Sequence, residues 1–343
     1  MNQVRIGIVG SGFMGLTHTE VICRYLKNAR LMAVGGGSRA PELAARYGVA
    51  AEANAEMLMQ RDDIDAVIIT TPHALHGPQA IFAAQHGKHL LVEKPLATVL
   101  EDCDRMIELC RQNRRVLMTA QSQRFRQANV VARRLIGEGA IGQVEMVSER
   151  QVSAYNPEDT EGLIRETAGH LLGHGIHNID RARWFMGDEV SLVGGVSASY
   201  NVPSPHPGSS MTLLRFREGG AATIWNSSEC PLPSFPPSSF FVRVMGAEGL
   251  LEVDSYGLTR MGTAKGWEVV YEQPTFNYAQ EPLSPVRLQS FTCQDQEFVD
   301  AILEQRSPSV TGEDGRAAVE IALASFLSHR SGQMISLPLP RHA

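Results

Sequence analysis

The chain has 343 residues, of which 43% are apolar and 20% charged, and its formal net charge at pH 7 is −6. This length favours two domains, and the composition is that of a folded globular protein. A mildly acidic chain without long runs of one charge argues against a nucleic-acid partner. No apolar stretch reaches the roughly 18 residues of a membrane span, and the N-terminus lacks the layout of a signal peptide, so we expect a cytoplasmic protein.

The first third alternates short β-branched runs with amphipathic helical stretches, as a doubly wound parallel sheet requires. The predicted strands are residues 4–9, 31–34, 66–70, 89–92 and 116–119. A helix from about Met14 to Tyr25 follows the first strand, and further helices are predicted at 41–47, 55–60, 78–86 and 100–112. We therefore predict an α/β Rossmann domain over residues 1–120.

The pattern changes after residue 120, where strands separated by Gly and Pro become frequent. We predict helices at 128–138 and 169–185, a loop at 156–162, and strands at 143–153, 191–200, 210–217, 221–227, 239–245, 250–254 and 268–271. Helices at 290–304 and 312–330 close the chain. Residues 121–343 are thus expected to form an α+β substrate-binding domain with a large open, mainly antiparallel sheet. Its uncovered face predicts a homodimer or homotetramer joined through that sheet.

Three glycines follow the first strand with the spacing GxGxxG: Gly10, Gly12 and Gly15. In a dinucleotide-binding loop they allow a tight turn, close approach of the pyrophosphate and close packing of the helix on the strand. The spacing occurs readily by chance, so the strand before it and the helix after it, with Phe13 and Met14 at its start, carry the prediction.

The end of the second strand discriminates NAD from NADP. An acidic residue here would bind the ribose hydroxyls of NAD, but residues 34–39 read Val-Gly-Gly-Gly-Ser-Arg. Ser38 and Arg39 suit a 2′-phosphate, because Arg makes charge-assisted hydrogen bonds and no carboxylate repels the ligand. We therefore favour NADP, with NAD as the alternative if Arg39 is an ordinary solvated side chain in a flexible glycine-rich loop.

Glu93, Lys94 and Pro95 follow the strand at 89–92, so Lys94 lies at the carboxyl end of a strand, where ligands bind in open α/β sheets. With this motif in place the sequence resembles the Gfo/Idh/MocA family of glucose-fructose oxidoreductase and inositol dehydrogenase relatives. The matching segments are Gly10–Gly15, Thr70–His76, Gly87–Leu96, Arg124-Phe125, Gly139–Gly142 and Gly175–Asp180, followed by Trp184 and Gly187.

The resemblance implies roles for five residues around the cofactor. Thr71 and Pro72 would lie against the nicotinamide half, and His76 would begin the neighbouring helix beside it. Glu93 and Lys94 would approach the nicotinamide and the substrate hydroxyl. A lysine near an oxidised nicotinamide is expected to have a lowered pKa and can relay a proton.

The same resemblance assigns His177 as acid or base and Asp180 as a substrate or relay contact. Oxidising a secondary alcohol moves a hydride to the nicotinamide while the hydroxyl proton leaves, and His177 can exchange that proton near neutral pH. The two residues are three positions apart, on one helix face.

This chain departs from the family where many members carry an Asp four residues before the histidine, because it has Gly173. His174 is an extra imidazole that could bind substrate or shuttle a proton. His170, His174 and His177 also have the spacing of metal ligands on a helix, but no HExxH and no nearby carboxylate accompany them, so we predict no metal site.

Basic side chains follow the last strand of the first domain and the start of the second: Arg124, Arg126, Arg150 and Arg165, with Tyr155 among them. Such a group would suit an anionic or carboxylated substrate, although solvated or interdomain arginines are an equally simple explanation. Arg124 and Tyr155 are our candidate substrate contacts.

The five cysteines (Cys23, Cys103, Cys110, Cys230, Cys293) are odd in number and show no CxxC, so neither a disulfide framework nor a zinc site is indicated. Three functions remain open. The first is an NAD(P)-dependent oxidoreductase acting on a secondary alcohol or carbonyl of a sugar or cyclic polyol. The others are a dehydrogenase of a carboxylated ring diol or hemiacetal, and a cofactor-binding regulator or scaffold that has lost turnover, which Gly173 motivates.

Overall fold

The computed structural model describes residues 2–154, 169–200, 207–233, 235, 239–277 and 280–340. The chain divides into two compact units. The first comprises Met1–Ser122 and Phe276–Arg316, and the second comprises Gln123–Thr275 and Ala317–Ala343. Each unit contains its own sheet, as the predicted fold class requires.

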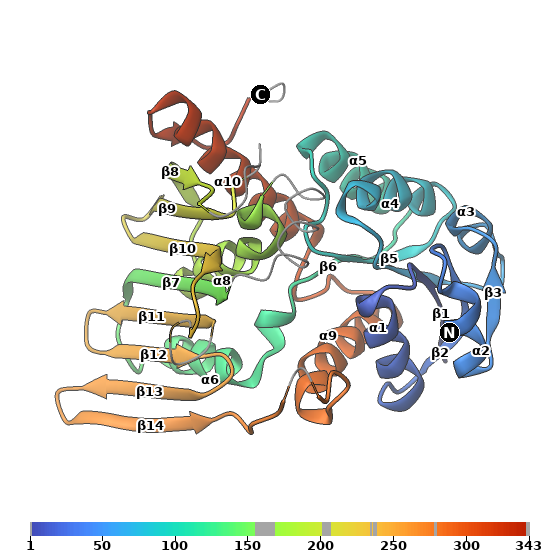
Figure 1. Ribbon diagram of the computed structural model, residues 1–343, viewed down its shortest axis with the longest axis horizontal. Coiled ribbons are helices and arrows are strands. Elements are labelled where there is room, and N and C mark those ends of the chain that lie inside the picture. Colours follow the sequence, from blue (N-terminus) through green and yellow to red (C-terminus); the bar gives the residue numbers. More distant parts are fainter. Residues whose placement is uncertain are drawn as a thin grey trace. The chain divides into compact units, whose positions relative to one another are not determined.

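The first unit is built on a parallel sheet with strand order β3-β2-β1-β4-β5-β6, which is the doubly wound Rossmann order (Figure 1). Its strands are β1 (Val4–Val9), β2 (Ala29–Gly35), β3 (Ala50–Glu52), β4 (Ala66–Ile69), β5 (His89–Glu93) and β6 (Leu117–Ala120). The connecting helices are α1 (Phe13–Arg24), α2 (Ala40–Tyr47), α3 (Ala55–Met59), α4 (His76–Gln85) and α5 (Leu100–Gln112). Strands β4 and β5 are buried along their whole length, because helices cover both faces of a parallel sheet. The Rossmann prediction is confirmed, and β3 is an additional short edge strand.

Helix α9 (Pro285–Glu304) belongs to the first unit, although the sequence analysis counted it with the second domain. It packs on α1, where Val21, Leu288 and Phe291 form a buried apolar cluster. Sequence order alone misplaces the helix, because the chain returns to the first unit after the second sheet is complete. The last helix, α10 (Gly312–Ser331), begins in the first unit, and its residues from Ala317 onward belong to the second.

The second unit contains a nine-stranded sheet with order β14-β13-β12-β11-β7-β10-β9-β8-β15 (Figure 1). The strands are β7 (Val144–Ala154), β8 (Val190–Ala198), β9 (Ser209–Phe216), β10 (Ala221–Cys230), β11 (Phe240–Gly246), β12 (Leu250–Asp254), β13 (Leu258–Thr263), β14 (Gly266–Glu272) and β15 (Ile335–Ser336). Only β7 and β10 pair in parallel among these nine, so the mainly antiparallel sheet is confirmed. The sequence analysis did not predict β13 or β15.

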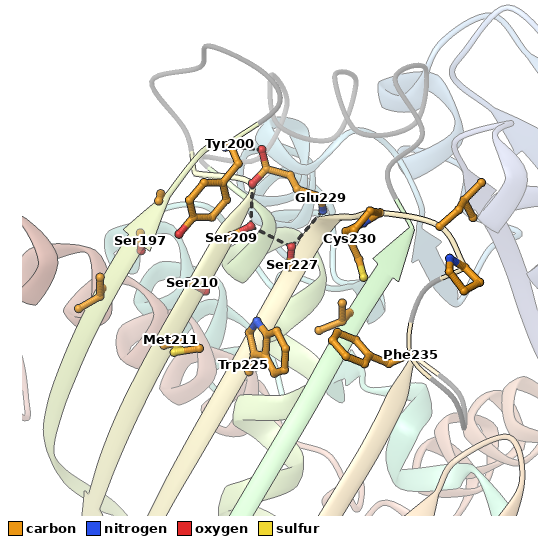
Figure 2. A pocket seen from close by; sticks show the side chains of 16 residues that line it. Ser197, Tyr200, Ser209, Ser210, Met211, Trp225, Ser227, Glu229, Cys230 and Phe235 are labelled. Atoms are coloured by element: carbon orange, nitrogen blue, oxygen red, sulfur yellow. Dashed lines mark hydrogen bonds between the residues drawn. The ribbon is translucent and has the colours of Figure 1, made fainter.

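Helices of the second unit cover one face of this sheet: α6 (Gln127–Gly137), α8 (Ile176–Met186) and the later part of α10. The opposite, open face carries exposed apolar side chains, among them Val196, Met211 and Leu213. Figure 2 shows a hollow of about 550 Å³ on this face, where Trp225 and Phe235 lie near the hydrogen-bonded Ser209, Ser227 and Glu229.

The helix predicted at 169–185 is interrupted. Residues Leu171–Gly175 form a π-helical turn (η3), and the regular helix α8 begins only at Ile176. Gly169 precedes the turn with φ +112°, and any side chain at Gly175 would overlap the Asn226 amide. Glycines therefore allow a wider turn that lies against β10, and π-turns are frequent at functional sites.

Candidate active site

The glycine loop between β1 and α1 has the shape of a pyrophosphate cradle. Gly10 has φ +108°, and a Cβ there would lie 2.7 Å from Thr70 Oγ1, while a Cβ at Gly15 would overlap the Gly10 carbonyl. The nearest atom to a Cβ at Gly12 is Arg39 Nη2 at 3.7 Å, so this side of the loop is open. No side chain caps α1 and its first turn carries no acid, so the loop fits the pyrophosphate of a dinucleotide.

The turn from β2 to α2 places Ser38 and Arg39 beside this loop. Gly36 and Gly37 have φ of +78° and +84°, conformations that side chains rarely adopt, and they bend the chain back toward the glycine loop. Ser38 and Arg39 are exposed, and the Arg39 guanidinium lies next to Gly12. Residues 34–39 contain no carboxylate, so the turn carries a positive charge that a 2′-phosphate would neutralise.

Thr71, Pro72 and His76 form a turn at the carboxyl end of β4. The Thr71 hydroxyl donates to Gln79 Oε1 at 2.6 Å, and Pro72 precedes the short turn η1 (His73–Leu75). The buried ring of His76 lies 2.8 Å from the Thr71 carbonyl and 2.7 Å from the Pro95 carbonyl. His76 thereby ties the turn after β4 to the turn after β5, which contains Lys94.

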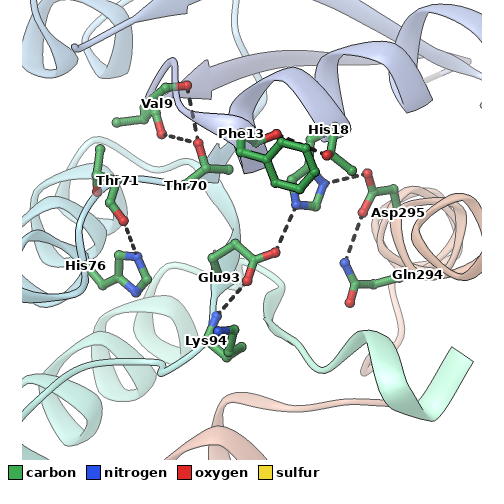
Figure 3. Close-up of polar contacts among 12 residues, drawn as sticks. Val9, Phe13, His18, Thr70, Thr71, His76, Glu93, Lys94, Gln294 and Asp295 are labelled. Carbon is green, nitrogen blue, oxygen red and sulfur yellow. Dashed lines mark hydrogen bonds and ion pairs between the residues drawn. The ribbon is translucent and has the colours of Figure 1, made fainter. Parts of the chain in front are cut away.

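Glu93, at the end of β5, is held by a fully buried histidine that the sequence analysis missed (Figure 3). His18 Nε2 lies 3.2 Å from Glu93 Oε1, and His18 Nδ1 lies 2.7 Å from Asp295 Oδ2. Burial alone would lower the pKa of His18, but the carboxylates of Asp295 and Glu93 outweigh it and raise the pKa to about 10. An imidazolium between two carboxylates therefore fixes the orientation and the negative charge of Glu93.

Lys94 follows directly. Its backbone N–H donates to Glu93 Oε2 at 3.1 Å, and the peptide bond to Pro95 is cis. Burial lowers the pKa of Lys94, and Glu93 opposes that shift. A lysine that loses its proton more readily than a solvated one is suited to proton exchange at the nicotinamide end of the sheet.

Phe13, at the start of α1, is supported from below by Arg287 of α9. The Arg287 guanidinium lies 4.6 Å from the centre of the Phe13 ring and donates to Thr17 Oγ1 at 3.2 Å. Met14 follows Phe13 in the first turn and packs against the cluster of Val21, Leu288 and Phe291. Helix α9 thus supports both the glycine loop, through Arg287, and Glu93, through Asp295 and His18.

In the second unit, His177 lies in the first turn of α8 and is 8% exposed, with its ring edge toward Phe240 at 6.3 Å. Asp180 lies one helical turn further and is paired with Arg124 through two hydrogen bonds of 2.7 and 2.6 Å. Both oxygens of Asp180 therefore accept from Arg124, and the structure brings these two predicted substrate contacts together as a buried ion pair.

The other histidines of this segment lie in or before the π-turn. His170 is buried and its Nε2 donates to Gln151 Oε1 at 2.8 Å, while His174 stacks at 5.1 Å from the His170 ring. A π-turn holds an extra residue, so His170, His174 and His177 do not share the face that a continuous α-helix would give them. Among the described residues, no group of three His, Cys, Asp or Glu side chains is placed to hold a metal ion.

Two further predicted residues, Tyr155 and Arg165, lie outside the described residues. Arg150 is placed differently from our expectation. Its neighbour Glu149 faces the helices and pairs with Arg181, so Arg150 points to the open face of the sheet, where it contacts the rings of Phe235 and Phe241. Arginines 124 and 150 therefore do not gather at one anion site.

The missed residues His18 and Asp295 differ in how far the sequence could reveal them. His18 follows Gly15 by three positions, so it lies on the same side of α1 as a glycine that packs on the sheet, and this spacing was a usable signal. Asp295 is 277 residues away and is brought to His18 only by the packing of α9 on α1. No spacing in the sequence predicts that contact.

A Rossmann sheet with an open glycine loop, a lysine at the carboxyl end of β5 and a second unit with a large open sheet define a two-domain nicotinamide-nucleotide dehydrogenase. Family comparison agrees. Residues 4–121 match the NAD-binding Rossmann domain of the Gfo/Idh/MocA oxidoreductase family, and residues 133–337 match its C-terminal alpha/beta domain. The chain belongs to the Gfo/Idh/MocA family of oxidoreductases.

Its relatives within the family span almost its whole length. The chain is 25% identical to a 2,7-anhydro-N-acetylneuraminate hydratase of Mediterraneibacter gnavus, covering 98% of the chain and 97% of the relative. It is 26% identical to the scyllo-inositol 2-dehydrogenase (NAD(+)) of Bacillus subtilis, covering 99% and 98%. A solved levoglucosan dehydrogenase in complex with NADH and L-sorbose superposes with a TM-score of 0.86 at 24% identity, covering 98% and 100%, which shows a shared fold. Among the described residues, no helix has the length and apolarity needed to cross a membrane.

Proposed function

We propose that this enzyme transfers a hydride between NADP and a secondary alcohol or carbonyl carbon of a sugar or cyclic polyol. The full-length similarity to an inositol dehydrogenase supports the substrate class. The observation that carries the proposal is Lys94, which burial makes easier to deprotonate and which is anchored through Glu93 at the carboxyl end of β5. That edge of the sheet also carries the glycine loop.

The proposed proton path uses this chain's own side chains. The bound nicotinamide nucleotide supplies the hydride acceptor or donor. In the oxidising direction, the substrate hydroxyl proton passes to His177 or to the neutral Nζ of Lys94, and reduction returns it. The buried Arg124–Asp180 pair keeps a carboxylate one helical turn from His177, where it favours the protonated imidazole.

The preference for NADP rests on the turn at Ser38 and Arg39. Arg39 lies beside the glycine loop and the turn contains no carboxylate, so both attraction and lack of repulsion favour a 2′-phosphate. The named cofactors of the relatives above are NAD(+) and NADH, so the proposal is specific to this chain.

A second copy of the chain is the proposed occupant of the open face of the nine-stranded sheet. Val196, Met211 and Trp267 are exposed by 68%, 60% and 54%, and they lie on strands of one sheet whose other face is covered by helices. A surface of this kind is typical of a subunit interface, and closed symmetry would bury it against itself. Changing Met211→Lys and Leu213→Glu together is expected to produce a smaller species by light scattering, without loss of NADPH binding.

The activity is tested by recording absorbance at 340 nm with NADP⁺ or NAD⁺ and a panel of sugars, cyclic polyols and their acids. The expected result is reduction of NADP⁺ with at least one panel member. Tight cofactor binding without turnover across the panel would instead favour a silent regulator, the possibility that Gly173 raises.

A further inference from the structure

Three arginines of the second unit are buried, and they differ in their partners. Arg124 pairs with Asp180, and Arg181, which is 0% exposed, pairs with Glu149 and also contacts Ser255. Arg126 is only 2% exposed, yet neither its Nε nor its Nη1 has a hydrogen-bond acceptor within the part of the chain that the structure describes. Arg126 is therefore an exception within its own unit.

The surroundings of Arg126 offer rings in place of counter-charge. Its guanidinium lies 4.6 Å from the centre of the Tyr256 ring, which provides a cation–π contact. Tyr271 is within electrostatic reach, but burial raises the pKa of Tyr271, so its hydroxyl stays neutral at neutral pH. Arg126 is also the N-cap of α6, where the helix dipole is positive and cannot offset the guanidinium.

A buried cation without acceptors is costly, because it has lost its hydration and gains little in return. Side chains of this kind persist where a ligand completes them. The rings of Tyr256 and Phe240 are 5.9 Å apart, and Phe240 in turn contacts His177. Two aromatic rings thus connect Arg126 to the proposed acid–base residue within the same unit.

We infer that Arg126 is the anchor of a subsite for a carboxylate, and that the physiological substrate carries an acidic group remote from its reacting carbon. The inference rests on the proposed function and narrows its substrate class to sugar acids or polyol acids. Guanidinium and carboxylate pair through parallel hydrogen bonds, which would satisfy the two nitrogens that lack acceptors. The apolar ring walls would exclude water and strengthen that pairing.

The test compares acids with uncharged molecules of the same skeleton: D-gluconate with D-sorbitol, D-glucuronate with D-glucose, and L-tartrate with L-threitol. Thermal unfolding is recorded at constant ionic strength, so that general salt effects cancel. For the native chain, at least one acid is expected to raise the unfolding temperature in a saturable manner, while its neutral match does not. The Arg126→Met variant is expected to lose that response, with at least tenfold weaker apparent affinity for the acid.

A stability readout separates this role from a structural one. Because Arg126 has no carboxylate partner, Arg126→Met is expected to unfold at the same or a higher temperature than the native chain in the absence of ligand. Arg181→Met, the matched control, leaves Glu149 buried without its partner and is expected to unfold at a lower temperature. If no acid exceeds its neutral match, or if Arg126→Met responds as the native chain does, the subsite is refuted. Turnover of neutral polyols would then leave the proposed dehydrogenase activity intact.

Discussion

The two units handle buried charge in opposite ways. In the first, His18 lies between Glu93 and Asp295, so the group that orients Lys94 is complete without any ligand. In the second, Arg124 and Arg181 have carboxylate partners, whereas Arg126 has none among the described residues. The contrast suggests that the nucleotide half is preorganised for one constant ligand, while the substrate half awaits a group that only the substrate supplies.

Lys94 gives the largest expected effect in the first unit. Lys94→Met removes the amine that exchanges the proton, so kcat/KM is expected to fall by about 10³-fold, within the range of lost general acid–base catalysis. NADPH affinity, measured by fluorescence titration, should change less than threefold. Lys94→Arg keeps the charge but cannot deprotonate, and it should be nearly as inactive. Full activity in either variant would remove Lys94 from the mechanism.

His177 is the corresponding residue in the second unit. His177→Asn is expected to lower kcat by about 10²-fold and to flatten the limb of the pH–rate profile near neutrality, because an amide does not titrate. His174→Asn serves as the matched variant from the π-turn and should mainly raise KM. Equal losses of kcat in both variants would contradict the distinction between acid–base catalysis and substrate binding.

Arg39 tests the cofactor preference. Removing a charge-assisted contact to the 2′-phosphate in Arg39→Ala is expected to raise the Kd of NADPH roughly tenfold or more, with the Kd of NADH unchanged. Arg30→Ala, an exposed arginine at the start of β2, is the control and should alter neither constant. Tighter binding of NADH than NADPH by the native chain would contradict the preference.

Asp295 tests how the first unit keeps Glu93 in place, and it gives the smallest expected effect. The pKa of His18 is raised from 6.5 to about 10, so this group's contribution to stability is fully present below pH 6.5 and is lost as pH rises through about 10. The free energy of unfolding from urea titrations should therefore fall with pH in that window by up to about 1.4 kcal/mol per pH unit.

In Asp295→Asn this dependence should flatten, stability at pH 7 should be lower, and kcat should drop only several-fold. Asp300→Asn, further along α9, is the control and should keep the native pH dependence. An unchanged slope in Asp295→Asn would show that His18 is not held as an imidazolium.

The sequence predicted the first unit better than the second, for physical reasons. Strand β1 and the glycine loop are local features in which apolar alternation and glycine spacing mark the structure directly. Strand β3 has only three residues and β15 only two, too short for any periodicity to register. The π-turn at Leu171–Gly175 depends on the fit of Gly175 against Asn226, a contact between segments far apart in the chain.

The candidate site divides along the same line. Lys94, Glu93 and the glycine loop were found because motif spacing reports on a local turn. The pairing of Arg124 with Asp180 and the contact of His18 with Asp295 were not foreseen, because charge partners are chosen by tertiary packing. The outward direction of Arg150 follows from strand register, which one sequence does not fix.

Direct observation of hydride transfer tests the central claim. The enzyme is incubated with NADP⁺ and a sugar, polyol or sugar acid deuterated at its carbinol carbons, and the reduced cofactor is analysed by mass spectrometry. The account predicts NADPH one mass unit heavier than the unlabelled compound, formed by the native enzyme and not by Lys94→Met. Reduced cofactor without deuterium, or none with any member of the substrate panel, would contradict it.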